Sequence, residues 1–194
     1  NSLPAALTAD FRALRYLTCP NQVLSDAANK SPGVQNGGPM FLMDPTSHRC
    51  CQHNFGHGWP YFVMRLWSAT PDNGLAAVMY GPSEVEAQVG NGTTVTIREE
   101  TNYPFSEEIK FTVALPQATE FPLYWRIPGW CAVAKILVNG QPLSVSTLPQ
   151  QCVRIVRQWQ DGDTIQLVLP MQIKLRKWKA NQDSVSVDRG PLTY

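Results

Sequence analysis

From residue 75 onward, the sequence is divided into short segments rich in β-branched and aromatic residues, with turn-forming residues between them. In residues 93–99, for example, Val95 and Ile97 alternate with polar neighbours, which is typical of a half-buried strand. The expected strands cover residues 75–80, 84–89, 93–99, 109–115, 123–127, 135–138, 153–156, 164–169 and 173–177. Many short strands at regular spacing predict a mainly β protein with an antiparallel β-sandwich, which we assign to residues 72–194.

The first part of the chain follows a different pattern, and we expect residues 1–71 to be helix and loop. Apolar residues recur at three- and four-residue spacing over residues 8–18, and Thr8 is suited to cap a helix there. Pro60 suits the first position of another helix, because a proline has no N–H group to leave unpaired. We expect that helix to end before Pro71.

The composition of the chain argues against two classes of binding partner, nucleic acids and membranes. The chain has 194 residues, 43% of them hydrophobic, which is enough for one core or two small ones. Its 16 basic and 15 acidic residues are interspersed without a basic stripe, so we expect no nucleic-acid partner. No apolar run approaches the roughly 20 residues that a membrane-spanning helix needs, so we expect no membrane partner either.

The groups best able to do chemistry lie between residues 48 and 57, where Cys50 and Cys51 are adjacent and all three histidines occur. Adjacent thiolates can hold a soft metal such as zinc, or one of them can attack an electrophile. A disulfide between neighbours is unfavourable, because bridged α-carbons usually lie about 4.4–6.8 Å apart and consecutive ones about 3.8 Å. The competing interpretation is a pair of inert buried thiols, since free cysteine often behaves as a small hydrophobe.

The surroundings of the cysteine pair favour a functional site. A helix that starts at Pro60 places Cys50 and Cys51 just before its N-terminus, where backbone dipoles stabilise a thiolate. His53 and His57 lie close to the thiols and are candidates for lining a substrate pocket. A local hydrogen-bonding role is the alternative for both histidines.

Several spaced motifs together resemble glycoside hydrolase family 127, typified by β-L-arabinofuranosidases. They are HRCCQHN at residues 48–54, GWP at 58–60, PDNGL at 71–75, TNYPF at 101–105, WRIPGW at 125–130 and RGPL at 189–192. The resemblance implies a six-hairpin α/α barrel as catalytic domain, followed by β-sandwich domains. Residues 1–71 then correspond to the end of the barrel. Because family members are much longer, we expect the upstream barrel of the same protein to be a partner of this chain.

The resemblance also implies a chemistry, namely retaining hydrolysis of a carbohydrate by a cysteine nucleophile. In the family, this cysteine belongs to a zinc site of one glutamate and three cysteines, and a separate glutamate is the acid/base. By motif position, Cys50 corresponds to the nucleophile and a zinc ligand, and Cys51 to a second zinc ligand. The sequence has no glutamate before Glu84, so we expect the chain alone to be inactive. Cys19, His48 or His53 could replace missing ligands, although their spacing fits no established zinc pattern.

Two other hypotheses remain open. The chain could be a non-catalytic carbohydrate-binding or structural sandwich with inert cysteines, or a stand-alone thiol-dependent metal-binding protein. Glu99 and Glu100 are adjacent on an expected strand, and we predict solvated side chains rather than a catalytic carboxylate pair. Trp125 and Trp130 are expected in the core rather than as stacking platforms for sugars.

Overall fold

The computed structural model describes residues 49–194, with side chains described from Gly56 onward. The chain divides into two compact units, with the boundary between Val63 and Met64. Helix α2 (Arg49–Val63) belongs to the first unit, which also includes Thr193 and Tyr194. The second unit, Met64–Leu192, contains the β-sandwich. The helix expected over residues 8–18 lies outside the described residues.

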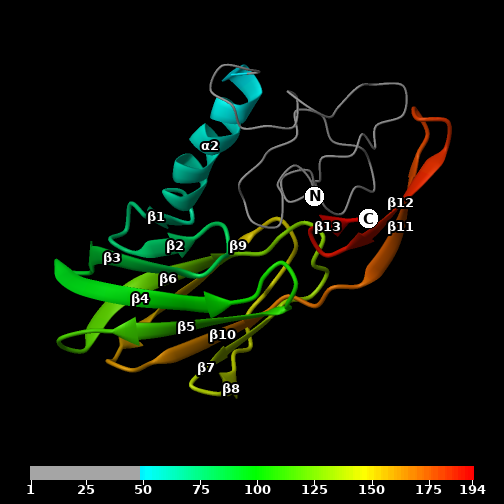
Figure 1. The fold of residues 1–194 in the computed structure, drawn as a ribbon. Coiled ribbons are helices and arrows are strands. Elements are labelled where there is room, and N and C mark those ends of the chain that lie inside the picture. The colour runs from blue at the N-terminus through cyan, green and yellow to red at the C-terminus, as the bar shows by residue number, and fades with distance from the viewer. Residues whose placement is uncertain (1–48) are drawn as a thin grey trace. The chain divides into compact units, whose positions relative to one another are not determined.

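The second unit is built on two larger sheets that pack face to face (Figure 1). The four-stranded sheet has the order β1 (Trp67–Ala69), β2 (Leu75–Ala77), β6 (Thr119–Arg126), β9 (Cys152–Trp159). The six-stranded sheet has the order β3 (Ser83–Val89), β4 (Thr93–Thr101), β5 (Glu108–Ala114), β10 (Thr164–Val168), β7 (Lys135–Val138), β8 (Gln141–Pro142). β2 pairs with β6 in parallel, whereas the other described pairs in these sheets are antiparallel. The predicted mainly β class and antiparallel sandwich are confirmed.

The alternation in the sequence explains the strands and their turns. On β4, Val95 and Ile97 are buried whereas Arg98 is exposed, as the period of two requires. A Gly-Asn-Gly turn joins β3 to β4, and the Gly92 N–H donates to Val89 O at 3.0 Å. Gly90 has a φ of 56° there, a conformation that glycine adopts without steric cost. The strands expected over residues 84–89 and 93–99 therefore pair as a hairpin.

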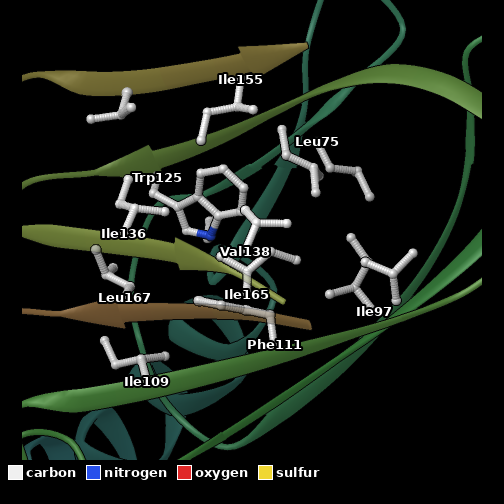
Figure 2. Packing of buried hydrophobic residues seen from close by; sticks show 14 of the residues in the cluster. Leu75, Ile97, Ile109, Phe111, Trp125, Ile136, Val138, Ile155, Ile165 and Leu167 are labelled. Carbon is white, nitrogen blue, oxygen red and sulfur yellow. The ribbon is translucent and has the colours of Figure 1, made fainter. Parts of the chain in front are cut away.

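Aromatic side chains from both sheets meet in one core. Trp125 of β6 contacts Phe111 of β5, with ring centroids 6.1 Å apart, and Trp159 of β9, at 6.4 Å. Figure 2 shows the Trp125 indole within this cluster of apolar side chains. Trp125 is 1% exposed, and Trp130 is partly buried against the same cluster. Both tryptophans therefore pack in or against the core, as predicted.

A third sheet follows the sandwich in the sequence, with the order β11 (Ile173–Trp178), β12 (Ser184–Arg189), β13 (Leu192–Thr193). Only β11 was predicted from the sequence. On one face of the β11–β12 hairpin, Arg176 forms an ion pair with Asp188 at 2.7 Å and lies over the Trp178 ring. On the other face, Ile173 and Leu175 are each 73% exposed.

The helix around the cysteines differs from the prediction. α2 includes Arg49, so Pro60 lies within the helix rather than at its first position. Pro60 cannot donate to the carbonyl of Gly56, four residues earlier, and its ring crowds that carbonyl, so the helix is weakened near its C-terminal end. The helix also ends earlier than expected, and Trp67, within the range expected for the helix, lies on β1. Among the described residues, no helix is long and apolar enough to cross a membrane.

Candidate functional site

All four residues proposed for the site lie on α2. Cys50 and Cys51 are its second and third residues, and His53 and His57 follow within the helix. Successive helical residues are turned by about 100°, so positions 50, 53 and 57 fall on one face of the helix and position 51 lies about a quarter-turn away. The His57 side chain is exposed. The side chains of the other three lie outside the described part, so their roles stay predictions.

The donor atoms on α2 fit zinc in type. Zinc takes thiolate ligands readily, and a structural zinc site almost always has four ligands. Cys50 and Cys51 supply two of them by sequence. Among residues with described side chains, no group of three or more histidines, cysteines or carboxylates gathers at one point.

The two described cysteines of the sandwich differ from each other. Cys131 is fully buried and unbridged, and burial raises the pKa of its thiol. Cys152 is also unbridged but is exposed at the start of β9. A high thiol pKa and lack of access both suppress nucleophilic reactivity, so Cys131 is the inert thiol of this pair.

The prediction of solvated glutamates is wrong for Glu99, which is 2% exposed on the inner face of β4. Its carboxylate accepts hydrogen bonds from the Gly81 N–H at 3.0 Å and from Ser83 Oγ at 3.1 Å. Ser83 Oγ in turn accepts one from Trp67 Nε1 at 3.2 Å. Burial outweighs these donors and raises the pKa of Glu99 to about 7. Glu100, which points the other way, is exposed as expected.

The segment 71–75, one of the motifs that carry the family resemblance, has an architectural role. Asp72 accepts hydrogen bonds from Thr70 Oγ1 at 2.6 Å, from the Tyr124 hydroxyl at 2.6 Å, and from Arg154 Nη2 at 2.9 Å. The Thr70 hydrogen bond is the largest of the interactions that hold the pKa of Asp72 far below its usual value. Since Tyr124 is on β6 and Arg154 on β9, the carboxylate ties the β1–β2 turn to two neighbouring strands.

Two hollows lie on the surface of the sandwich. A groove of about 600 Å³ is lined by Glu100, Thr101, Asn102, Ser106, Glu108, Lys110, Gly140, Thr164, Ile165 and Gln166. A second hollow of about 560 Å³ shares Thr101, Asn102 and Ser106 with the groove and adds Pro82, Tyr103 and Phe105. His57 lines neither of them. The sequence analysis missed the groove, although the motif at residues 101–105 lies at its edge.

The sandwich corresponds to a known family of domains. Residues 74–171, about half of the chain, match the family described as β-L-arabinofuranosidase, GH127 middle domain. Together with the fold, this match places the chain in the glycoside hydrolase class. The chain belongs to glycoside hydrolase family 127, as its motifs predicted.

Solved structures agree with this assignment. A GH127 β-L-arabinofuranosidase from Geobacillus stearothermophilus T6 is 27% identical with a TM-score of 0.78, and the match covers 100% of this chain and 30% of that one. A structure described as a glycoside hydrolase is 24% identical with a TM-score of 0.75, covering 100% of this chain and 32% of that one. A GH127 β-arabinofuranosidase is 20% identical with a TM-score of 0.74, covering 100% and 31%. The last two show the fold alone. No curated protein matches the sequence.

Proposed function

We propose that α2 contributes part of the active site of a retaining glycoside hydrolase of the β-L-arabinofuranosidase kind. The observation that carries the proposal is membership of family 127, through the sandwich match at residues 74–171. The chain spans about 30% of the length of the GH127 enzyme from Geobacillus, which is described as a β-L-arabinofuranosidase. Activity, substrate and partner of the whole protein are accordingly parts of this proposal.

In this proposal the Cys50 thiolate attacks the anomeric carbon of the sugar. The carbon–sulfur bond forms as the bond to the leaving group breaks, and water then hydrolyses the glycosyl-cysteine with retention of configuration. Cys50 and Cys51 would be ligands of a zinc ion, which would keep both thiols deprotonated at neutral pH. His53 and His57, which follow Cys50 along one face of α2, would border the sugar.

The proton donor has to come from another part of the protein. A retaining glycosidase needs a second carboxyl group that protonates the leaving oxygen and later deprotonates water. Glu84 is the first glutamate of the chain, and the buried Glu99 is enclosed in the sandwich core. We assign the acid/base and the remaining zinc ligands to an upstream barrel domain of the same protein.

The test compares the 194-residue chain with the full product of its gene, using p-nitrophenyl β-L-arabinofuranoside as substrate. We expect hydrolysis by the full product, its loss in Cys50→Ser, and no turnover by the 194-residue chain above its own Cys50→Ser control. Removing general acid catalysis alone typically costs a factor of about 10²–10⁴. Full activity in Cys50→Ser would reject the assignment of Cys50 as the nucleophile. Turnover by the 194-residue chain would reject the assignment of the acid/base to an upstream domain.

The competing function is a non-catalytic carbohydrate-binding or structural module with inert cysteines. The position of both described hollows favours it, since they lie on the sandwich. Binding of glycans that survives replacement of both Cys50 and Cys51 by serine, together with absence of hydrolysis in the full gene product, would support this alternative.

A further inference from the structure

The groove follows the outer face of the six-stranded sheet, over strands β4, β5 and β10. Glu100 lies opposite Lys110 in the β4–β5 register, and Lys110 lies opposite Gln166 in the β5–β10 register. The three side chains therefore form one row across the floor of the groove. Glu108 and Asn102 extend the polar lining towards the end of β4.

Several polar side chains of the groove are available to a ligand. Among the described residues, the side chains of Gln166, Asn102 and Glu108 have no hydrogen-bond partner, and Lys110 Nζ is 3.9 Å from Glu100 Oε2. An amide both donates and accepts, a carboxylate accepts and an ammonium donates. The groove thus presents donors and acceptors side by side, with the opposite charges of Glu100 and Lys110 adjacent.

The rim of the groove is a loop with many internal hydrogen bonds. Thr101 Oγ1 donates to Glu108 O at 2.7 Å and accepts from the Tyr103 N–H at 3.0 Å. The Phe105 N–H donates to Asn102 O at 2.8 Å. The loop is therefore held in one shape, yet the Phe105 ring is 71% exposed. An exposed aromatic ring on a pre-organised loop binds a partner at a small entropic cost.

We propose that the groove together with Phe105 is a non-catalytic binding site for a neutral oligosaccharide. Sugar hydroxyls donate and accept hydrogen bonds, which suits the mixed lining, and the apolar face of a sugar ring packs on an aromatic ring such as Phe105. The volume of about 600 Å³ is within the range of ligand sites. The choice of a carbohydrate rests on the proposed function, whereas the site is separate from the thiols.

Two other kinds of ligand fit less well. A peptide cannot extend the sheet at this place, because β5 is paired on both sides, with β4 and with β10. A nucleic acid would meet the carboxylates of Glu100 and Glu108 against the single ammonium of Lys110. A neutral, hydroxyl-rich chain avoids both difficulties.

The test uses the 194-residue chain and L-arabino-oligosaccharides, with xylo-oligosaccharides as a second series, measured by calorimetry and by amide chemical shifts. We expect binding that shifts the amides of Asn102, Lys110 and Gln166. Gln166→Ala and Phe105→Ala should each weaken binding by about fivefold, the loss of roughly one hydrogen bond or one ring contact. Gln88→Ala, an exposed glutamine on β3 outside the groove, is the matched control and should bind normally.

The groove would be rejected as a binding site if neither series of oligosaccharides bound. Equal affinity of Gln166→Ala, Phe105→Ala and Gln88→Ala would also reject it. Circular dichroism of each variant shows that the sandwich is intact. The assay is independent of hydrolysis, because Cys50→Ser should bind as well as the parent chain. Cys50-dependent hydrolysis without groove binding rejects this inference alone, and groove binding without hydrolysis by the full gene product rejects the proposed activity alone.

Discussion

Ser83 Oγ donates a hydrogen bond to Glu99 Oε2 at 3.1 Å inside the sandwich. The carboxylate also accepts from Gly81, so it ties β4 to the segment that leads into β3. Because Ser83 also accepts from Trp67, the first strand of the sandwich joins the same chain of hydrogen bonds. The described hydrogen bonds to this carboxylate come from neutral donors, which explains why burial controls its pKa.

The first prediction concerns pH. The pKa of Glu99 is raised from 4.5 to about 7, so between these values the folded protein binds more protons than the unfolded chain. The free energy of unfolding should therefore fall as pH rises from about 4.5 to about 7, by up to about 3 kcal/mol. Glu99→Gln, which cannot ionise, should remove this part of the pH dependence. Urea titrations from pH 4 to 8 measure it.

The neighbouring glutamate is the control for this experiment. Glu100 is exposed on the opposite face of β4, so Glu100→Gln should keep the pH dependence of the parent chain. Parallel stability curves for the parent and Glu99→Gln across this pH range would show that Glu99 titrates normally.

The second prediction concerns the close approach of Gly74 to β6. A Cβ atom at this position would lie 2.2 Å from the carbonyl oxygen of Pro122, which is backbone and cannot turn away. We expect Gly74→Ala to lower the free energy of unfolding by about 2–3 kcal/mol. Gly81→Ala is the matched control, because nothing lies within 4 Å of its Cβ position. Thermal unfolding of both variants tests the difference, and equal melting temperatures would contradict it.

The third prediction compares two buried indoles. Trp159 Nε1 donates to Phe121 O at 3.0 Å, whereas Trp125 Nε1 is buried without a partner among the described residues. Trp159→Phe loses a satisfied hydrogen bond, while Trp125→Phe removes a donor that is already unpaired. We expect Trp159→Phe to be more destabilising by about 1 kcal/mol, since both substitutions remove the same volume. Denaturant unfolding measures both, and the reverse order would be inconsistent with these contacts.

The fourth prediction concerns the thiols. With iodoacetamide, Cys152 should react readily in the folded chain because it is exposed, and Cys131 should resist until unfolding because it is buried with a raised pKa. If Cys50 and Cys51 are zinc ligands, they should also react, and zinc should protect them and not Cys152. Mass mapping of the alkylated peptides at several pH values measures the extent of alkylation of each cysteine. Resistance of Cys50 and Cys51 like that of Cys131 would identify them as inert.

Most of the sandwich could be predicted from the sequence because period-two alternation is a local signal. The same rule could have located Glu99, which shares the parity of the buried Val95 and Ile97 on β4. The prediction used the opposite orientation of adjacent strand residues to reject a catalytic pair, but it did not assign Glu99 to the inner face of the strand. The strands β1 and β8 were missed because they have only 3 and 2 residues, too few for the alternation of apolar and polar residues to show.

The helix and the groove were harder to predict, for different reasons. α2 contains Gly56, Gly58 and Pro60, residues of low helix propensity, so no local signal marks its extent. The family motifs at residues 48–54 and 101–105 pointed to both regions without showing their geometry. The groove is formed by residues from β4, β5 and β10, and only their register brings Glu100, Lys110 and Gln166 together.

The parallel pairing of β2 with β6 also affects the order in which the sheet can form while the protein is being synthesised. Leu75 lies opposite Leu123, so β2 has to wait for about 50 further residues before its neighbour exists. At roughly 5–20 residues per second, that interval lasts several seconds. The hydrogen bond from Arg154 to Asp72 can form only later still, once Arg154 has been synthesised. During this time β3, β4 and β5 can already form a meander. The early hairpin of β1 and β2 must remain soluble while the edge of β2 that later pairs with β6 is still unpaired.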